Sequence, residues 1–150
     1  MTDITLSDFF KQKVAKSARV PRNWTAKKKQ FVKEVEALYD VIVRKYLGDA
    51  GAGVTVEYVD TTVDEATIGE YPARAMVVRV GDERIVFTPK GFSVYGASGR
   101  VDVRGDRGDG VLVLRSAGGW GIVQGMTPTL RVVPLSGGTL LDLLRDIMRP

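Results

Sequence analysis

The side chains available for chemistry are limited in this sequence, because its 150 residues include no cysteine and no histidine. Those two residues supply thiolate nucleophiles, the usual general base near neutral pH and most protein ligands of zinc and haem iron. Their absence excludes disulfides, Ser-His-Asp and Cys-His triads, and metal sites built on nitrogen or sulfur. Carboxylates, Lys, Tyr, Ser and oxygen-bound Mg²⁺ remain. We therefore assign no catalytic residue, no metal site and no cofactor, and we favour a non-enzymatic function.

Acidic residues form one group that could still do chemistry. Its members are Glu57, Asp60, Asp64, Glu65 and Glu70. Clustered carboxylates can hold magnesium for phosphoryl chemistry. However, no Glu is followed by a Lys two residues later, so the Asp…Glu-x-Lys pattern of one large nuclease class is absent. Solvent-facing strand ends explain these acids more simply, and a carboxylate–metal enzyme is a remote alternative.

Basic residues are concentrated at the start of the chain. Residues 1–50 hold eleven Lys and Arg against six Asp and Glu, whereas residues 51–150 hold eleven against twelve. A basic helix can bind nucleic acid, because neutralised phosphates release counterions and aromatic rings stack on bases. The candidate contacts are Lys27, Lys28, Lys29, Lys33, Arg22 and Trp24. No known nucleic-acid motif accompanies them, so a solvated helix face is the favoured interpretation.

Large apolar residues in the Gly-rich second half are candidates for a partner surface. They are Phe92, Tyr95, Trp120 and Met126. Such residues can line a groove for a ligand or a partner. The simpler interpretation, which we favour, is that they belong to the core.

The segment 99–110 contains the tripeptide Arg-Gly-Asp twice, at 104–106 and 107–109. That tripeptide can bind integrins on extracellular proteins, but the acidic start of this sequence does not resemble a secretory signal. Gly and Asp are also the residues that a tight turn requires. A calcium loop over the same segment would lack the spacing and the terminal Glu of an EF-hand. We therefore predict a turn.

Two helices are predicted before residue 50. The first covers residues 5–18 and should end at 19–22, because Pro21 lacks an N–H and disfavours helical angles at Val20. The second covers residues 24–47, where apolar residues recur with a period near 3.6. These residues are Phe31, Val35, Leu38, Ile42 and Tyr46.

After Gly51 the apolar pattern alternates with period two, which is typical of half-buried strands. Strands are predicted at 54–59, 75–80, 84–88, 92–95, 100–103, 111–114, 120–123 and 130–133, with a weaker candidate at 63–68. They must pair antiparallel, because parallel crossovers need a dozen or more residues. A short helix should follow, with a capping box at 139–142. Its apolar face consists of Leu140, Leu144, Ile147 and Met148.

The predicted fold class is α+β. It has two N-terminal helices, an antiparallel β-rich body in the form of a bent sheet or partial barrel, and an amphipathic C-terminal helix. The order of elements after residue 51 resembles that of pleckstrin-homology-like folds, a likeness of element order without a shared motif. A plain two-layer α+β arrangement is the alternative. The length, with 44% hydrophobic and 27% charged residues, indicates one domain over residues 1–150.

These observations favour a small binding or accessory module. We expect it to be cytoplasmic, because no apolar run is long enough to span a membrane. We expect it to engage a protein partner or a second copy of itself. A nucleic-acid-associated protein that uses the Lys-rich helices is the alternative.

Overall fold

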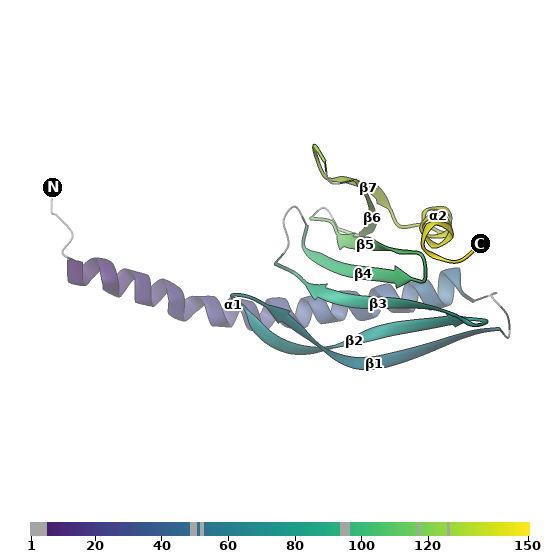
Figure 1. Cartoon of the computed structure of the whole chain (residues 1–150). Coiled ribbons are helices and arrows are strands. Elements are labelled where there is room, and N and C mark those ends of the chain that lie inside the picture. Colours follow the sequence, from purple (N-terminus) through teal and green to yellow (C-terminus); the bar gives the residue numbers. More distant parts are fainter. Residues whose placement is uncertain (1–5, 49–50, 52, 94–96, 117, 126) are drawn as a thin grey trace.

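The computed structural model describes residues 6–48, 51, 53–93, 97–116, 118–125 and 127–150, and for residues 12–23 it describes the backbone alone. The described chain forms a long helix, an antiparallel sheet and a short helix (Figure 1). In chain order the elements are α1 (Leu6–Val41), the π-helix η1 (Ile42–Tyr46), β1 (Val54–Glu65), β2 (Gly69–Val80), β3 (Glu83–Gly91), β4 (Gly99–Gly105), β5 (Gly108–Leu114), β6 (Trp120–Gly125), β7 (Arg131–Pro134) and α2 (Gly137–Ile147). The predicted α+β class is confirmed.

One continuous helix takes the place of the two that the sequence predicted. The helix α1 runs without a break through residues 19–22, so the predicted helix end at Pro21 is wrong. An internal proline removes one hydrogen bond and costs about 3 kcal/mol. Ending the helix there would instead add the cost of nucleating a second one. The Lys, Gln and Ala residues on both sides favour helix, so a single helix is the more stable solution.

The C-terminal half of α1 packs on the sheet. Four residues of the predicted stripe are at most 2% exposed: Phe31, Val35 and Leu38 on α1, and Ile42 on η1. Tyr39 is equally buried, whereas Tyr46 is only half-buried. The N-terminal part extends beyond the sheet (Figure 1) and carries exposed Leu6, Phe9 and Phe10. Within the described ranges, no helix combines the length and the apolar character that a membrane span requires.

The strands form one seven-stranded antiparallel sheet, in which each strand pairs with its neighbours in sequence. The order runs from β1 to β7, and the sheet is not closed into a barrel. The strand predicted at 92–95 is wrong where it can be checked. A register shift after Pro89 and a positive φ of 135° at Gly91 end β3, which leaves Phe92 and Ser93 outside the ladder. Tyr95 lies outside the described residues.

The β1–β2 hairpin is longer than the rest of the sheet. Its ladder continues to Glu65 and Gly69, whereas β2 pairs with β3 only as far as Met76 and Phe87. Continuing that second ladder would place Arg74 opposite Pro89, which has no N–H to donate. The outer part of the hairpin, residues 60–74, is therefore unpaired with β3 and free to pack beside α1.

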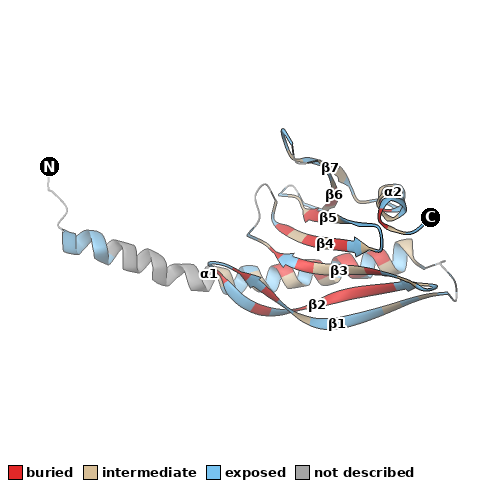
Figure 2. Ribbon diagram, viewed as in Figure 1, coloured by how far each residue is buried: buried red, intermediate tan, exposed pale blue. Residues whose placement is uncertain are grey.

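The core lies between one face of the sheet and the two helices (Figure 2). At its centre are side chains that are at most 2% exposed: Met76, Val78, Phe87, Val101, Val103 and Leu112. Helix α2 closes this core with buried Leu140 and Ile147, as its apolar pattern predicted.

The cap of α2 differs from the predicted one at 139–142. The cap residue is Ser136, whose hydroxyl accepts a hydrogen bond from the Thr139 backbone N–H at 3.1 Å. The Thr139 hydroxyl accepts one in return from the Ser136 N–H at 2.8 Å. The helix therefore begins three residues earlier than the Thr–Asp spacing suggested.

Candidate functional site

Lysines of α1 meet the outer part of the β1–β2 hairpin in a groove. On the helix, Thr25, Lys28, Lys29, Val32 and Lys33 share one side, because residues three and four apart lie next to each other on a helix surface. Tyr71 and Pro72 of β2 form the opposite wall. These seven residues line a groove of about 480 Å³, which we call the lysine groove.

The lysine groove combines apolar walls with a cationic rim. The Lys28 Nζ lies 5.6 Å from the ring centroid of Tyr71, within the range of a cation–π interaction. No carboxylate is among the lining residues. Among the described side chains, no Asp or Glu forms an ion pair with Lys28, Lys29 or Lys33. A surface with this charge attracts anionic ligands.

A buried carboxylate holds Tyr71 in the wall of the groove. The Tyr71 hydroxyl donates to Glu65 Oε2 at 2.5 Å, and the Ser93 backbone N–H donates to Glu65 Oε1 at 2.8 Å. Glu65 is only 8% exposed, and Gly91 leaves room for its carboxylate, which any side chain at position 91 would strike. Burial, together with the hydrogen bond to Glu65, raises the pKa of Tyr71.

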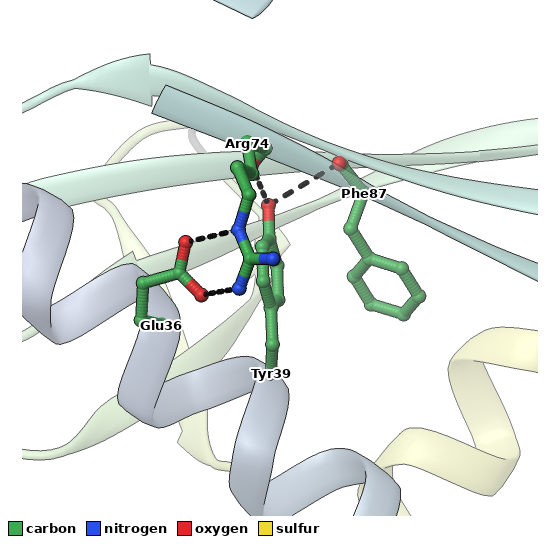
Figure 3. A network of polar contacts seen from close by, with 4 residues as sticks. All are labelled: Glu36, Tyr39, Arg74 and Phe87. Carbon is green, nitrogen blue, oxygen red and sulfur yellow. Dashed lines mark hydrogen bonds and ion pairs between the residues drawn. The ribbon is translucent and has the colours of Figure 1, made fainter. Parts of the chain in front are cut away.

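A second polar network fastens the hairpin to α1 (Figure 3). The Arg74 guanidinium donates two hydrogen bonds to the carboxylate of Glu36, at 2.8 and 2.5 Å. The Tyr39 hydroxyl lies against the backbone carbonyls of Arg74 at 2.9 Å and Phe87 at 3.3 Å. Tyr39 therefore supplies a donor at the place where β2 and β3 separate, and this contact positions the hairpin wall of the groove.

The predicted basic contacts do not all lie in one place. Consecutive helix residues point about 100° apart, so Lys27 lies away from Lys28 and Lys29. The Lys27 Nζ is 5.2 Å from the ring of Trp24, and that ring packs 5.9 Å from Phe92. Lys28, Lys29 and Lys33 thus share the lysine groove, whereas Lys27 and Trp24 lie outside its lining. The side chain of Arg22 is outside the described part of the chain.

The residues of the predicted partner surface do not form one surface either, because Phe92 and Trp120 lie in different places. Phe92 packs against Phe31 and Tyr71, with ring centroids 6.3 Å away in each case. Trp120 lines a separate cavity of about 320 Å³ beside Leu38. Both residues pack on the core, in line with the interpretation favoured from the sequence. Tyr95 and Met126 lie outside the described residues, so their predicted role is untested.

The acidic residues do not converge. Glu65 faces inward, whereas Glu57, Asp60, Asp64 and Glu70 are exposed. Among the residues that the structure describes, no three acidic side chains are placed to hold a metal ion. The carboxylate–metal alternative therefore gains no support from the geometry.

The predicted turn is present but shorter than the two Arg-Gly-Asp tripeptides: Asp106 and Arg107 form it, and the remaining tripeptide residues pair in β4 and β5. The carboxylate of Asp106 pairs with Arg149 at 3.0 Å. The backbone N–H of Arg107 donates to the carbonyl of Ile147 at 2.8 Å. This turn therefore anchors the end of the chain.

The residues that sequence reasoning missed are those that shape the groove from behind. Glu65 was grouped with exposed acids, yet it is two residues after buried Val63 and so points to the same side of β1. The alternation of side chains along this strand could therefore have indicated that Glu65 points inward. The partner Tyr71 and the Glu36–Arg74 pair had no sequence signal, because each joins residues brought together by the fold.

Comparison with known proteins adds no relative: no protein-family model, no curated protein and no solved structure matches this chain. The resemblance in element order to pleckstrin-homology-like folds is accordingly unconfirmed.

Proposed function

We propose that this protein is a binding module that holds an acidic segment of a partner protein in the lysine groove. The observation that carries the proposal is the composition of the groove: Lys28, Lys29 and Lys33 surround apolar surface and no carboxylate lines it. An acidic segment with one apolar anchor matches both properties. Its carboxylates would face the lysines while the anchor packs on Val32 and Pro72.

A protein ligand fits this site better than a nucleic acid. Binding of single-stranded nucleic acid relies on aromatic rings with a free face on which bases stack. Here the Trp24 ring contacts Phe92 and Lys27, and the Tyr71 ring contacts Phe92 and Lys28. Because protein groups already pack on these rings, the stacking that would favour a nucleic acid is weakened.

The proposal is tested by reversing charges inside and outside the groove. The double variant Lys29→Glu/Lys33→Glu changes two lining residues. Lys11→Glu/Lys45→Glu changes the net charge equally at two exposed lysines outside the groove, one on α1 and one on η1. The probe is a fluorescent Glu-rich peptide with one central Trp, measured by anisotropy at about 50 mM salt. We expect the groove variant to bind about tenfold more weakly and the control variant to bind within about twofold of the unchanged protein.

An oligonucleotide of equal net charge serves as the competing ligand. The unchanged protein could bind the oligonucleotide more tightly than the peptide, and Lys29→Glu/Lys33→Glu could abolish that binding. This result would show that the groove binds nucleic acid and not an acidic protein segment. Equal weakening in both double variants would show that net charge alone drives binding, and the lysine groove would lose its assigned role.

A further inference from the structure

Three arginines gather on the face of the sheet opposite to the helices. Arg79 and Arg84 are directly opposite each other in the β2–β3 ladder. Their neighbours Val78 and Ile85 are buried in the core, so alternation along each strand places both arginines on the outer face. Arg104 pairs with Val86, two residues from Arg84, and so lies diagonally across on the same face. All three side chains are exposed.

This arrangement is unfavourable for the fold alone. Like charges directly opposite each other on neighbouring strands destabilise a sheet. Asp82, Glu83 and Asp106 lie at the neighbouring β2–β3 and β4–β5 turns. They do not offset this repulsion, because all three pair with Arg149, which follows α2. Its guanidinium lies 3.1 Å from Asp82, 3.3 Å from Glu83 and 3.0 Å from Asp106.

Three carboxylates border the arginines. Asp102, two residues from Arg104 on the same face of β4, pairs with Arg100 at 2.7 Å. Glu57 lies 3.6 Å from Arg79 on the β1 side. Asp109 is opposite Arg104 on the β5 side, and no ion pair joins the two in the described structure. These carboxylates therefore lie at the edge of the group, and Arg79, Arg84 and Arg104 are the three cations that share its centre.

We propose that Arg79, Arg84 and Arg104 form a binding site for a phosphate group, either free or as a monoester on a small molecule. The guanidinium fork matches phosphate oxygens in bidentate geometry. Register places the Cβ atoms of the directly opposed pair about 5 Å apart, with the third arginine on the diagonal within reach of a long side chain. A bound dianion would remove the repulsion between the opposed arginines. This site is separate from the lysine groove and does not depend on its function.

The test is thermal unfolding in sodium phosphate compared with sodium chloride of equal ionic strength at pH 7.5. Phosphate stabilises many proteins by exclusion from their surface, so the comparison is made between variants. We expect about 50 mM phosphate to raise the Tm of the unchanged protein by roughly 2–4 °C more than that of Arg84→Gln or Arg104→Gln. In chloride, Arg84→Gln should melt at or above the unchanged protein, because the like-charge pair is gone.

Two controls keep the result specific. Arg131→Gln removes an exposed arginine of β7 and should keep the full phosphate increment, as should the groove variant Lys29→Glu/Lys33→Glu. Equal increments in all variants would overturn the proposal, as would an Arg84→Gln that retains the increment. Repeating the series with phenyl phosphate identifies the source. A larger increment than with inorganic phosphate assigns a monoester, and a smaller one assigns the free ion.

Discussion

At the scale of single residues, Tyr39 links the helix to the hairpin that carries the groove. Its side chain is 1% exposed, and its hydroxyl meets the carbonyls of Arg74 and Phe87. Burial, and after it the nearby charge of Glu36, raises the pKa of this phenol. The hydroxyl therefore remains a donor, which is the form that the two carbonyls require.

Tyr39→Phe should destabilise the protein by about 1–3 kcal/mol, because the two carbonyls lose their buried donor while the ring still fills its place. Urea unfolding followed by circular dichroism measures the difference. Tyr46→Phe is the control, since the hydroxyl of Tyr46 makes no hydrogen bond within the described structure; it should change stability by less than about 0.5 kcal/mol. Equal effects of the two variants would contradict the role given to Tyr39.

At the scale of elements, α2 shows how a short helix is specified. Eleven residues are too few for a stable isolated helix. Ser136 and Thr139 satisfy its first backbone groups through a reciprocal pair of hydrogen bonds. Leu140 and Ile147 then attach it to the sheet. The cap sets where the helix begins, and burial determines that it forms.

Ser136→Ala should cost about 1 kcal/mol, because it leaves one N–H at the start of α2 without an acceptor. Ser136→Asp should stay within about 0.5 kcal/mol of the unchanged protein, since an Asp side chain can accept the same hydrogen bond. The Tm of the three proteins, measured by calorimetry, distinguishes them. If Ser136→Asp lowers the Tm as much as Ser136→Ala does, loss of the capping hydrogen bond is not the cause of the destabilisation.

At the scale of the whole molecule, residues 147–149 attach α2 to the sheet. Ile147 is 2% exposed, and its carbonyl accepts the N–H of Arg107 from the β4–β5 turn. Arg149 then pairs with carboxylates from two different turns. These contacts join the last residues to β3, β4 and β5, so stability of the sheet and docking of α2 form one cooperative unit.

Ile147→Ala should therefore lower the free energy of unfolding by about 2–5 kcal/mol, the usual cost of emptying a buried aliphatic site. Leu141→Ala on the same helix is the matched control, because Leu141 is 47% exposed. It should cost less than about 1 kcal/mol, and both variants should unfold in one transition when followed by far-UV and tryptophan signals. Separate transitions for α2 and the sheet would contradict a single unit.

The sequence indicated the elements well where apolar rhythm was strong. The stripe from Phe31 to Ile42 is buried, β3 and β4 alternate as predicted, and Leu140 and Ile147 of the predicted α2 face are buried. The alternation fails in β2, where Ala75 to Val78 are all buried. The sequence-based predictions were wrong at two element boundaries. Pro21 does not end α1, and Gly91 ends β3 before the strand predicted at 92–95.

What the sequence determined by itself was the class of fold, the antiparallel pairing and the cationic face of α1, because each follows from local periodicity or composition. The tertiary structure decided which lysines share a groove, that Glu65 is buried beneath Tyr71, and that Arg79, Arg84 and Arg104 meet on one face. Those contacts depend on which strand segments pair and where each ladder ends, which local periodicity does not specify. The β2–β3 ladder ends at Met76 and Phe87, next to Pro89 and the Tyr39 hydroxyl. The sequence pattern of β2 or of β3 alone does not indicate this end.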